Sequence, residues 1–191
     1  MLFRSVIFKG VGRHPNTGKK KGGLKVHSVI QANEGVPCDV KFTSAATNDS
    51  FMLAPGHFKH EEIVALDRAY INYEKFEELT ERNVVYVTKM KKNLVYQIDE
   101  DTAHMTPEGL MEYRVKHVTF TKKVAEGSDI VHKARIVTYV DIKKNKQAKL
   151  ISLLTNDMEM PVEEIVAIYR KRWEIELLFY DKYIIMQSSV A

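Results

Sequence analysis

Residues 169–182 have the sequence YRKRWEIELLFYDK. Apolar residues recur at helical spacing through this stretch and just before it, which predicts an amphipathic helix. These residues are Ile165, Ile168, Tyr169, Trp173 and Leu177. Tyr169, Arg172 and Glu176 lie at positions i, i+3 and i+7, so a helix stacks them along nearly one face. A guanidinium and a carboxylate are costly on a plain core helix, but they suit a site that holds a metal ion beside a phosphate.

This pattern resembles a signature of the insertion-sequence transposases that use an Asp-Asp-Glu triad on an RNase H-like fold. Tyr169, Arg172 and Glu176 match the tyrosine, arginine and glutamate of that signature with its spacing. The signature also has a lysine after six further residues, and here that position holds Tyr183. Lys182 lies one residue early, about 100° around a helix, so the resemblance assigns it to DNA binding with a departure from the pattern.

Two upstream stretches match the same family in the same order. Residues 63–70, IVALDRAY, resemble the strand that carries the family's second catalytic aspartate, which is Asp67 in this sequence. Residues 23–27, GLKVH, resemble the strand before it. The resemblance runs from Phe3 to Phe179, and the order and distances of the motifs are more specific than any one of them.

The resemblance implies a function in DNA transposition. The family cleaves DNA strands and transfers them at the ends of bacterial mobile elements, with two Mg²⁺ or Mn²⁺ ions that activate the nucleophile and stabilise the leaving oxygen. Hard divalent ions prefer carboxylate ligands, and the resemblance assigns Asp67 and Glu176 as the catalytic and metal-binding residues. It assigns Tyr169 and Arg172 to the phosphates of double-stranded DNA, both of the element ends and of the target.

Simpler interpretations remain open for each of these residues. Asp67 could be a strand-end carboxylate that caps the next helix. Tyr169, Arg172 and Glu176 could form an ordinary helix-surface ion pair beside a core tyrosine. Three lysines in the glycine-rich loop could follow a phosphate backbone or lie in a solvated linker, and the sequence favours neither interpretation. They are Lys19, Lys20 and Lys21.

One part of the family pattern is missing from the sequence. The family's first catalytic aspartate lies on a strand before the region that resembles Phe3–Arg13, and no aspartate precedes Asp39. We therefore expect a chain that is truncated at both ends, lacks the first strand of the core, binds metal weakly and is catalytically inactive. The alternatives are a non-catalytic DNA-binding remnant and a relic that folds poorly and self-associates.

The predicted fold class is α/β. An RNase H-like mixed sheet flanked by helices is expected from residues 1–93 and 157–191, and a β-rich insertion from residues 94–156 before the last helix. Within these regions, we expect strands at 24–32, 38–44, 63–66, 84–87, 115–124, 131–139 and 150–154. Helices are expected from Asn48 to Pro55, from Tyr70 to Arg82 and from Val162 onward. Residues 63–66 form a continuous apolar run, which is typical of a strand buried on both faces.

Composition places few limits on this function. Among the 191 residues, 45% are hydrophobic and 28% are charged, as in ordinary globular proteins. A net charge of +4 permits a polyanionic partner without requiring one. The single cysteine, Cys38, excludes an internal disulfide and fits a reducing cytoplasm. No apolar run reaches the length of a membrane span, so we expect a cytoplasmic protein without a membrane partner.

Overall fold

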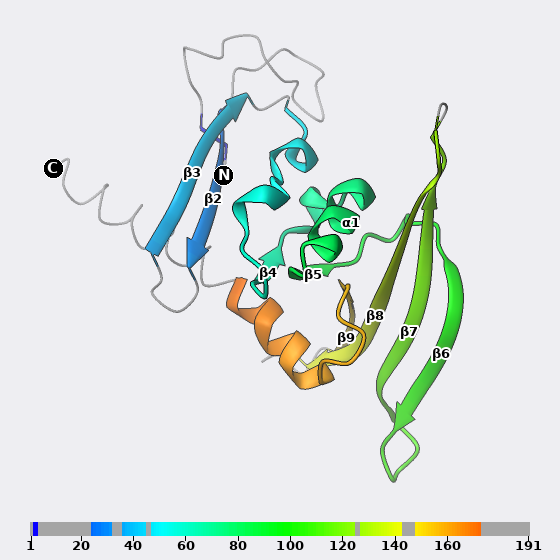
Figure 1. The fold of residues 1–191 in the computed structure, drawn as a ribbon. Coiled ribbons are helices and arrows are strands. Elements are labelled where there is room, and N and C mark those ends of the chain that lie inside the picture. The colour runs from blue at the N-terminus through cyan, green and yellow to red at the C-terminus, as the bar shows by residue number, and fades with distance from the viewer. Residues whose placement is uncertain are drawn as a thin grey trace, which may run out of the picture. The chain divides into compact units, whose positions relative to one another are not determined.

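The computed structural model describes residues 2–3, 24–31, 36–44, 47–124, 127–142 and 148–172. The chain divides into two compact units. One comprises Met1–Met52 with Glu174–Ala191, and the other comprises Leu53–Trp173. Each unit is described by itself, and the strand and helix labels are those of Figure 1.

The first unit contains a three-stranded antiparallel sheet in the order β1-β2-β3. Its strands are β1 (Leu2–Phe3), β2 (Leu24–Gln31) and β3 (Val36–Ser44). The predicted pair of strands around residues 33–35 is thereby confirmed, although β3 begins two residues earlier than expected. The predicted short helix after Asn48 is instead the single 3₁₀ turn η1 (Asp49–Met52). Lys25 of β2 reaches this turn, and its Nζ lies 2.9 Å from Asp49 Oδ1.

The second unit contains a six-stranded mixed sheet in the order β4-β5-β9-β8-β7-β6. Strands β4 and β5 are parallel, and the other neighbouring pairs are antiparallel. The strands are β4 (Ile63–Leu66), β5 (Val85–Lys89), β6 (Gln97–Met105), β7 (Met111–Lys122), β8 (Ile130–Ile142) and β9 (Ala148–Thr155). In Figure 1, β6, β7 and β8 are long neighbouring strands that curve together.

Two helices pack on opposite faces of this sheet. Helix α1 (Tyr73–Glu81) buries Phe76 and Leu79 in one apolar cluster, which includes Tyr86 of β5. The helix of residues 162–172 contributes to a second cluster, which includes Val87 of β5. Because neighbouring strand residues point to opposite faces, Tyr86 and Val87 assign the two clusters to the two sides of the sheet. Leu154 and Leu153 of β9 divide between the clusters in the same way.

The segment between β4 and β5 differs from the sequence prediction at its start. The helix expected from Tyr70 begins at Tyr73, because Asn72 is its N-cap and accepts a hydrogen bond from Lys75 N at 3.4 Å. The residues before it form a separate 3₁₀ turn, η3 (Arg68–Tyr70). Strand β4 is also less buried than a strand covered on both faces, since only Leu66 is fully buried. Pro55 does not end a helix but begins the 3₁₀ turn η2 (Pro55–His57).

The mixed sheet with a helix on each face confirms the predicted α/β class and is consistent with an RNase H-like fold. Strands β6 to β9, which fall in residues 94–156, continue the sheet of β4 and β5 through the pairing of β9 with β5. The division into a core and a β-rich insertion stays a prediction. Within the described ranges, no helix is long and apolar enough to cross a membrane.

Candidate functional site

The candidate site lies where strand β4 ends. Leu66, the last residue of β4, belongs to the apolar cluster on the α1 face of the sheet. Asp67 follows with extended backbone, φ −70° and ψ 146°, so the alternation of the strand continues through it. Its side chain is therefore directed to the opposite face, which the helix of residues 162–172 covers. Asp67 Oδ1 accepts a hydrogen bond from Ala69 N at 2.9 Å, which caps η3.

The helix of residues 162–172 presents a continuous buried stripe to the sheet. It begins directly after Pro161, as the sequence predicts, because proline suits the first turn of a helix. Its buried residues are Val162, Ile165, Val166 and Tyr169, which recur at helical spacing. Tyr169 is 5% exposed and packs in the cluster around Val87 and Leu153. Arg172 lies three residues further along, on the same face of the helix.

Arg172 and Asp67 meet at this end of the sheet. Arg172 Nη1 lies 3.5 Å from Asp67 Oδ2. The guanidinium carbon of Arg172 also lies 5.3 Å from the centre of the Tyr169 ring, which is within the range of a cation–π contact. The Arg172 side chain is 11% exposed, whereas the Asp67 side chain is 44% exposed. The ring therefore supports a mostly buried cation, and the cation faces a carboxylate that solvent still reaches.

Three of the residues predicted from the sequence are thus brought together, and the simpler interpretations hold in part. Asp67 does cap the turn that follows it, although that turn is η3 and not helix α1. Tyr169 is a core tyrosine. However, the ion pair joins Arg172 to a carboxylate of a distant strand and not to a neighbour on its own helix. The result is a guanidinium beside a carboxylate, at the end of one strand.

The other predicted residues lie outside the described ranges. They are Glu176, Lys182, Lys19, Lys20 and Lys21. In the part of the chain that the structure describes, no group of three His, Cys, Asp or Glu residues gathers to hold a metal ion. The Asp67 carboxylate fits a hard divalent ion in kind, but one carboxylate is too few ligands for such an ion. The described residues alone do not complete a metal site.

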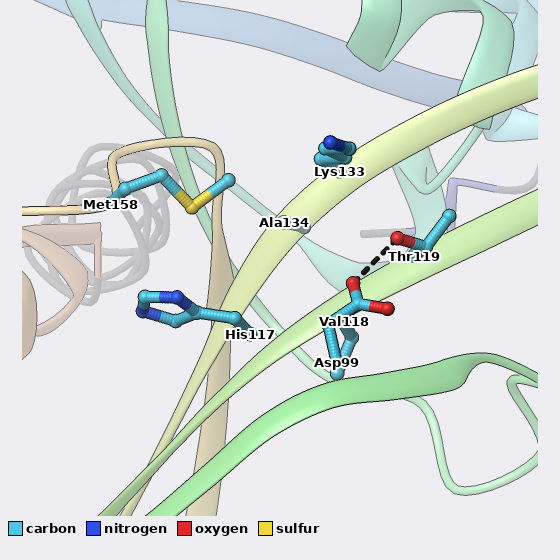
Figure 2. Close-up of a pocket in the computed structure, with 7 residues that line it drawn as sticks. All are labelled: Asp99, His117, Val118, Thr119, Lys133, Ala134 and Met158. Atoms are coloured by element: carbon cyan, nitrogen blue, oxygen red, sulfur yellow. Dashed lines mark hydrogen bonds between the residues drawn. The ribbon is translucent and has the colours of Figure 1, made fainter.

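A pocket along strands β6, β7 and β8 is a weaker candidate. It has a volume of about 330 Å³ and is lined by Asp99, His117, Val118, Thr119, Lys133, Ala134 and Met158. Figure 2 shows Thr119 turned toward Asp99, and Thr119 Oγ1 donates a hydrogen bond of 2.6 Å to Asp99 Oδ2. Its carboxylate and its lysine have opposite charges, and its lining includes neither Asp67 nor Arg172. We therefore assign no function to this pocket.

A buried polar chain was not predicted from the sequence. His132 Nδ1 lies 2.6 Å from Glu77 Oε2, and His132 Nε2 lies 2.8 Å from the Tyr86 hydroxyl. Because an ionised carboxylate only accepts, we assign Nδ1 as the donor to Glu77 and Nε2 as the acceptor from Tyr86. Burial lowers the pKa of His132, although Glu77 opposes that effect. The three residues come from α1, β5 and β8, so no local sequence pattern could have identified them.

Comparison with known proteins identifies the family of this chain. Residues 8–181 match the family model described as "Transposase DDE domain". A Sinorhizobium fredii protein named as the transposase y4zB is 26% identical over 157 residues, which are 82% of this chain and 43% of that protein. A Geobacillus stearothermophilus protein, named as the transposase for insertion sequence element IS5377, is 20% identical over 167 residues. These residues are 84% of this chain and 40% of that protein.

The fold and the comparisons together define a transposase domain of the α/β class. The chain belongs to the DDE transposase family, because the family model covers most of its length. It spans less than half the length of each of these two curated relatives. The sequence-based resemblance to DDE transposases is thereby confirmed at the level of the family. This family generally uses divalent metal ions and binds DNA.

Proposed function

We propose that this chain is the DNA-binding and catalytic region of an insertion-sequence transposase, with Asp67 and Arg172 in its active site. The observation that carries the proposal is the 3.5 Å contact between these two residues, with the guanidinium of Arg172 over the ring of Tyr169. A phosphodiester substrate requires a cationic group for its phosphate and a carboxylate for the metal ion that acts on it. The described site places one of each side by side.

Arg172 is the phosphate-binding residue in this proposal. Its guanidinium offers several planar donors that can bind two phosphate oxygens at once. Tyr169 is buried beneath it, so we assign Tyr169 as the residue that positions Arg172. Its ring restricts the rotamers of the long arginine side chain, which reduces the entropy lost when a phosphate is captured.

The metal ligands are proposed from Asp67 and the sequence signature. Asp67 has one oxygen, Oδ2, that is not committed to the η3 turn. Glu176 is proposed as the second carboxylate because it follows Arg172 at the spacing of the family signature. Lys182 and the lysines at 19–21 are proposed as further contacts to the DNA backbone. The bound Mg²⁺ or Mn²⁺ supplies Lewis-acid chemistry at the phosphate.

We also propose that these 191 residues alone do not cleave DNA, because only Asp67 and Glu176 match the family's triad. A non-catalytic protein that still binds element ends is the alternative function. A cleavage assay on a labelled duplex with Mg²⁺ or Mn²⁺ distinguishes the two. Strand cleavage by the wild type that is lost in Asp67→Asn would show that the chain is active. It would also support the proposed role of Asp67 in the active site.

DNA binding by the Arg172→Gln variant tests the proposal directly. The probe is a fluorescein-labelled duplex of mixed sequence, and the measurement is fluorescence anisotropy over a salt titration. Arg170→Gln is the matched control, since Arg170 lies on the same helix, is 63% exposed and pairs with Asp141 Oδ1 at 3.2 Å. We expect Arg172→Gln to weaken binding more than Arg170→Gln and to reduce the salt dependence by about one phosphate contact.

Equal effects of the two substitutions would reject the proposed role of Arg172. Circular dichroism melting of both variants shows whether either loses its fold. Arg172→Lys provides a further check, because it keeps the charge but loses the paired donors. Binding that is partly restored by lysine supports a phosphate contact.

A further inference from the structure

We propose that the Asp67–Arg172 ion pair is an internal lock on the active site. With no anion bound, the Arg172 guanidinium faces Oδ2 of Asp67 and opposes binding of a divalent cation there. Capture of a phosphate by Arg172 draws the guanidinium away and releases the carboxylate. The inference rests on the proposed function, since it takes Arg172 as the phosphate-binding residue.

Both oxygens of the Asp67 carboxylate are engaged within the protein. Oδ1 accepts the hydrogen bond from Ala69 N, and Oδ2 faces Arg172 Nη1. A divalent cation that binds Oδ2 would lie within a few ångströms of another positive charge. Like charges at that separation repel each other, and the repulsion is greater where solvent is partly excluded. The Arg172 side chain is in such a place, being 11% exposed.

The contact between Asp67 and Arg172 is close enough for Arg172 to compete with a cation for the carboxylate, and long enough for a phosphate to replace it. At 3.5 Å it is a charge contact and exceeds the usual length of an N–H···O hydrogen bond. A tighter ion pair in the same unit provides a comparison: Arg114 donates two hydrogen bonds of 2.6 Å each to Asp101. A bidentate phosphate contact therefore offers Arg172 a better geometry than Asp67 does.

The Tyr169 ring can stay in contact with the Arg172 guanidinium while the guanidinium moves. The guanidinium carbon lies 5.3 Å from the centre of this ring, and the ring is fixed in the apolar cluster. Arg172 can therefore exchange one anionic partner for another while keeping its contact with the ring. Linkage then requires the coupling to be mutual: an anion on Arg172 favours a cation on Asp67, and the cation favours the anion by the same factor.

Manganese binding to the full chain tests the lock without any measurement of catalysis. Free Mn²⁺ is measured by electron paramagnetic resonance during titration of the wild type, Arg172→Gln and the control Arg170→Gln. We expect Arg172→Gln to bind Mn²⁺ about fivefold more tightly, which corresponds to about 1 kcal/mol, the upper range for a partly exposed ion pair. The gain should disappear when Asp67→Asn is added. Arg172→Lys, which keeps the charge, should bind Mn²⁺ as weakly as the wild type.

Sulfate serves as the oxyanion probe for the second half of the inference. We expect sulfate to tighten Mn²⁺ binding in the wild type but not in Arg172→Gln, with sodium chloride at matched ionic strength as the control. Unchanged or weaker Mn²⁺ binding in Arg172→Gln would overturn the lock. That failure is distinct from failure of the proposed function, which is decided by the effect of the same variant on duplex binding.

Discussion

Asp67 Oδ2 and Arg172 Nη1 lie 3.5 Å apart, but their environments differ: the arginine is 11% exposed and the aspartate is 44% exposed. Arg172 is thus mostly enclosed by the protein, whereas solvent still reaches the Asp67 carboxylate, although Arg172 faces its Oδ2. This asymmetry is what a binding site needs, since the buried partner is pre-organised and the exposed one is accessible.

Tyr169 should contribute through its ring. Tyr169→Phe keeps the ring beneath Arg172, so we expect little change in stability and in duplex binding. Tyr169→Ala removes a buried aromatic side chain and should lower the free energy of unfolding by about 3–5 kcal/mol. Chemical denaturation of both variants measures the stability, and anisotropy measures the binding. Weakened duplex binding in Tyr169→Phe, with the fold intact, would instead assign a direct role to the hydroxyl.

Asp67 should have two separable structural roles. Asp67→Asn keeps an oxygen that can cap η3, because asparagine is as good an N-cap as aspartate. Asp67→Ala removes both the cap and the partner of Arg172. We expect Asp67→Ala to be less stable than Asp67→Asn by about 1 kcal/mol in urea denaturation. Equal stability of the two variants would show that the hydrogen bond from Ala69 N contributes nothing.

The sequence predicts those parts of the fold whose hydrophobic period is strong. Residues 63–66 and the stretch after Pro161 were placed correctly, because an apolar run and a helical stripe each have one reasonable interpretation. Strand β6 was not predicted, since its sequence QIDEDTAHM has no apolar alternation and every residue is exposed. A charged edge strand forms through pairing with its neighbour, and its charges protect it from further association.

The sequence predicts members of the candidate site but not their contacts. Asp67, Tyr169 and Arg172 were identified from motif spacing, which identifies residues without showing what they touch. Arg172 can pair with Asp67 because both side chains lie on the same face of the sheet, and that placement follows from the fold. The buried chain of Glu77, His132 and Tyr86 had no local signal at all, because each member comes from a different element.

Asn156 should be important for the stability of the second unit. It accepts a hydrogen bond from Tyr86 N at 2.9 Å, and its Nδ2 donates to Thr80 Oγ1 and to Val84 O. It thereby joins the end of β9 to α1 and to the start of β5. We expect Asn156→Ala to lower the free energy of unfolding by about 2–3 kcal/mol, because it leaves part-buried backbone groups unpaired.

Asn156→Asp is the informative companion of that variant. It keeps the acceptor for Tyr86 N but places a carboxylate against the carbonyl of Val84, so it should also destabilise the protein. Asn48→Ala is the control and should cost less, because the Asn48 side chain accepts a hydrogen bond from Ser50 N at an exposed turn. A loss in Asn156→Ala no larger than in the control would contradict the joining role.

The stability of the protein should decrease as the pH falls below neutrality, and His132 should cause part of the decrease. Burial lowers the pKa of His132 in the folded state from its ordinary value of 6.5. The unfolded chain therefore binds a proton at a higher pH than the folded chain does, so stability rises with pH in that range. The contribution is complete above about pH 6.5 and is lost progressively toward the lower folded pKa.

The groups around His132 set the size of this effect. Glu77 of α1 accepts from Nδ1 and favours the charged form, whereas Tyr86 of β5 donates to Nε2 and favours the neutral form. Phe76 and Phe120 add apolar surface at ring centroid distances of 6.0 and 6.5 Å. Desolvation outweighs the carboxylate, and the net direction is downward.

Urea denaturation at pH 7.5 and pH 5.5 tests this assignment. We expect the wild type to lose stability between the two values. We expect His132→Gln, although less stable at pH 7.5, to lose less.

The contribution of His27 must be separated from that of His132, because burial also lowers the pKa of His27 and its contribution has the same sign. Since His27 lies in the other unit and remains in the His132→Gln variant, the difference between wild type and variant reports His132 alone. An unchanged pH dependence in His132→Gln would contradict a contribution of His132 to the loss of stability.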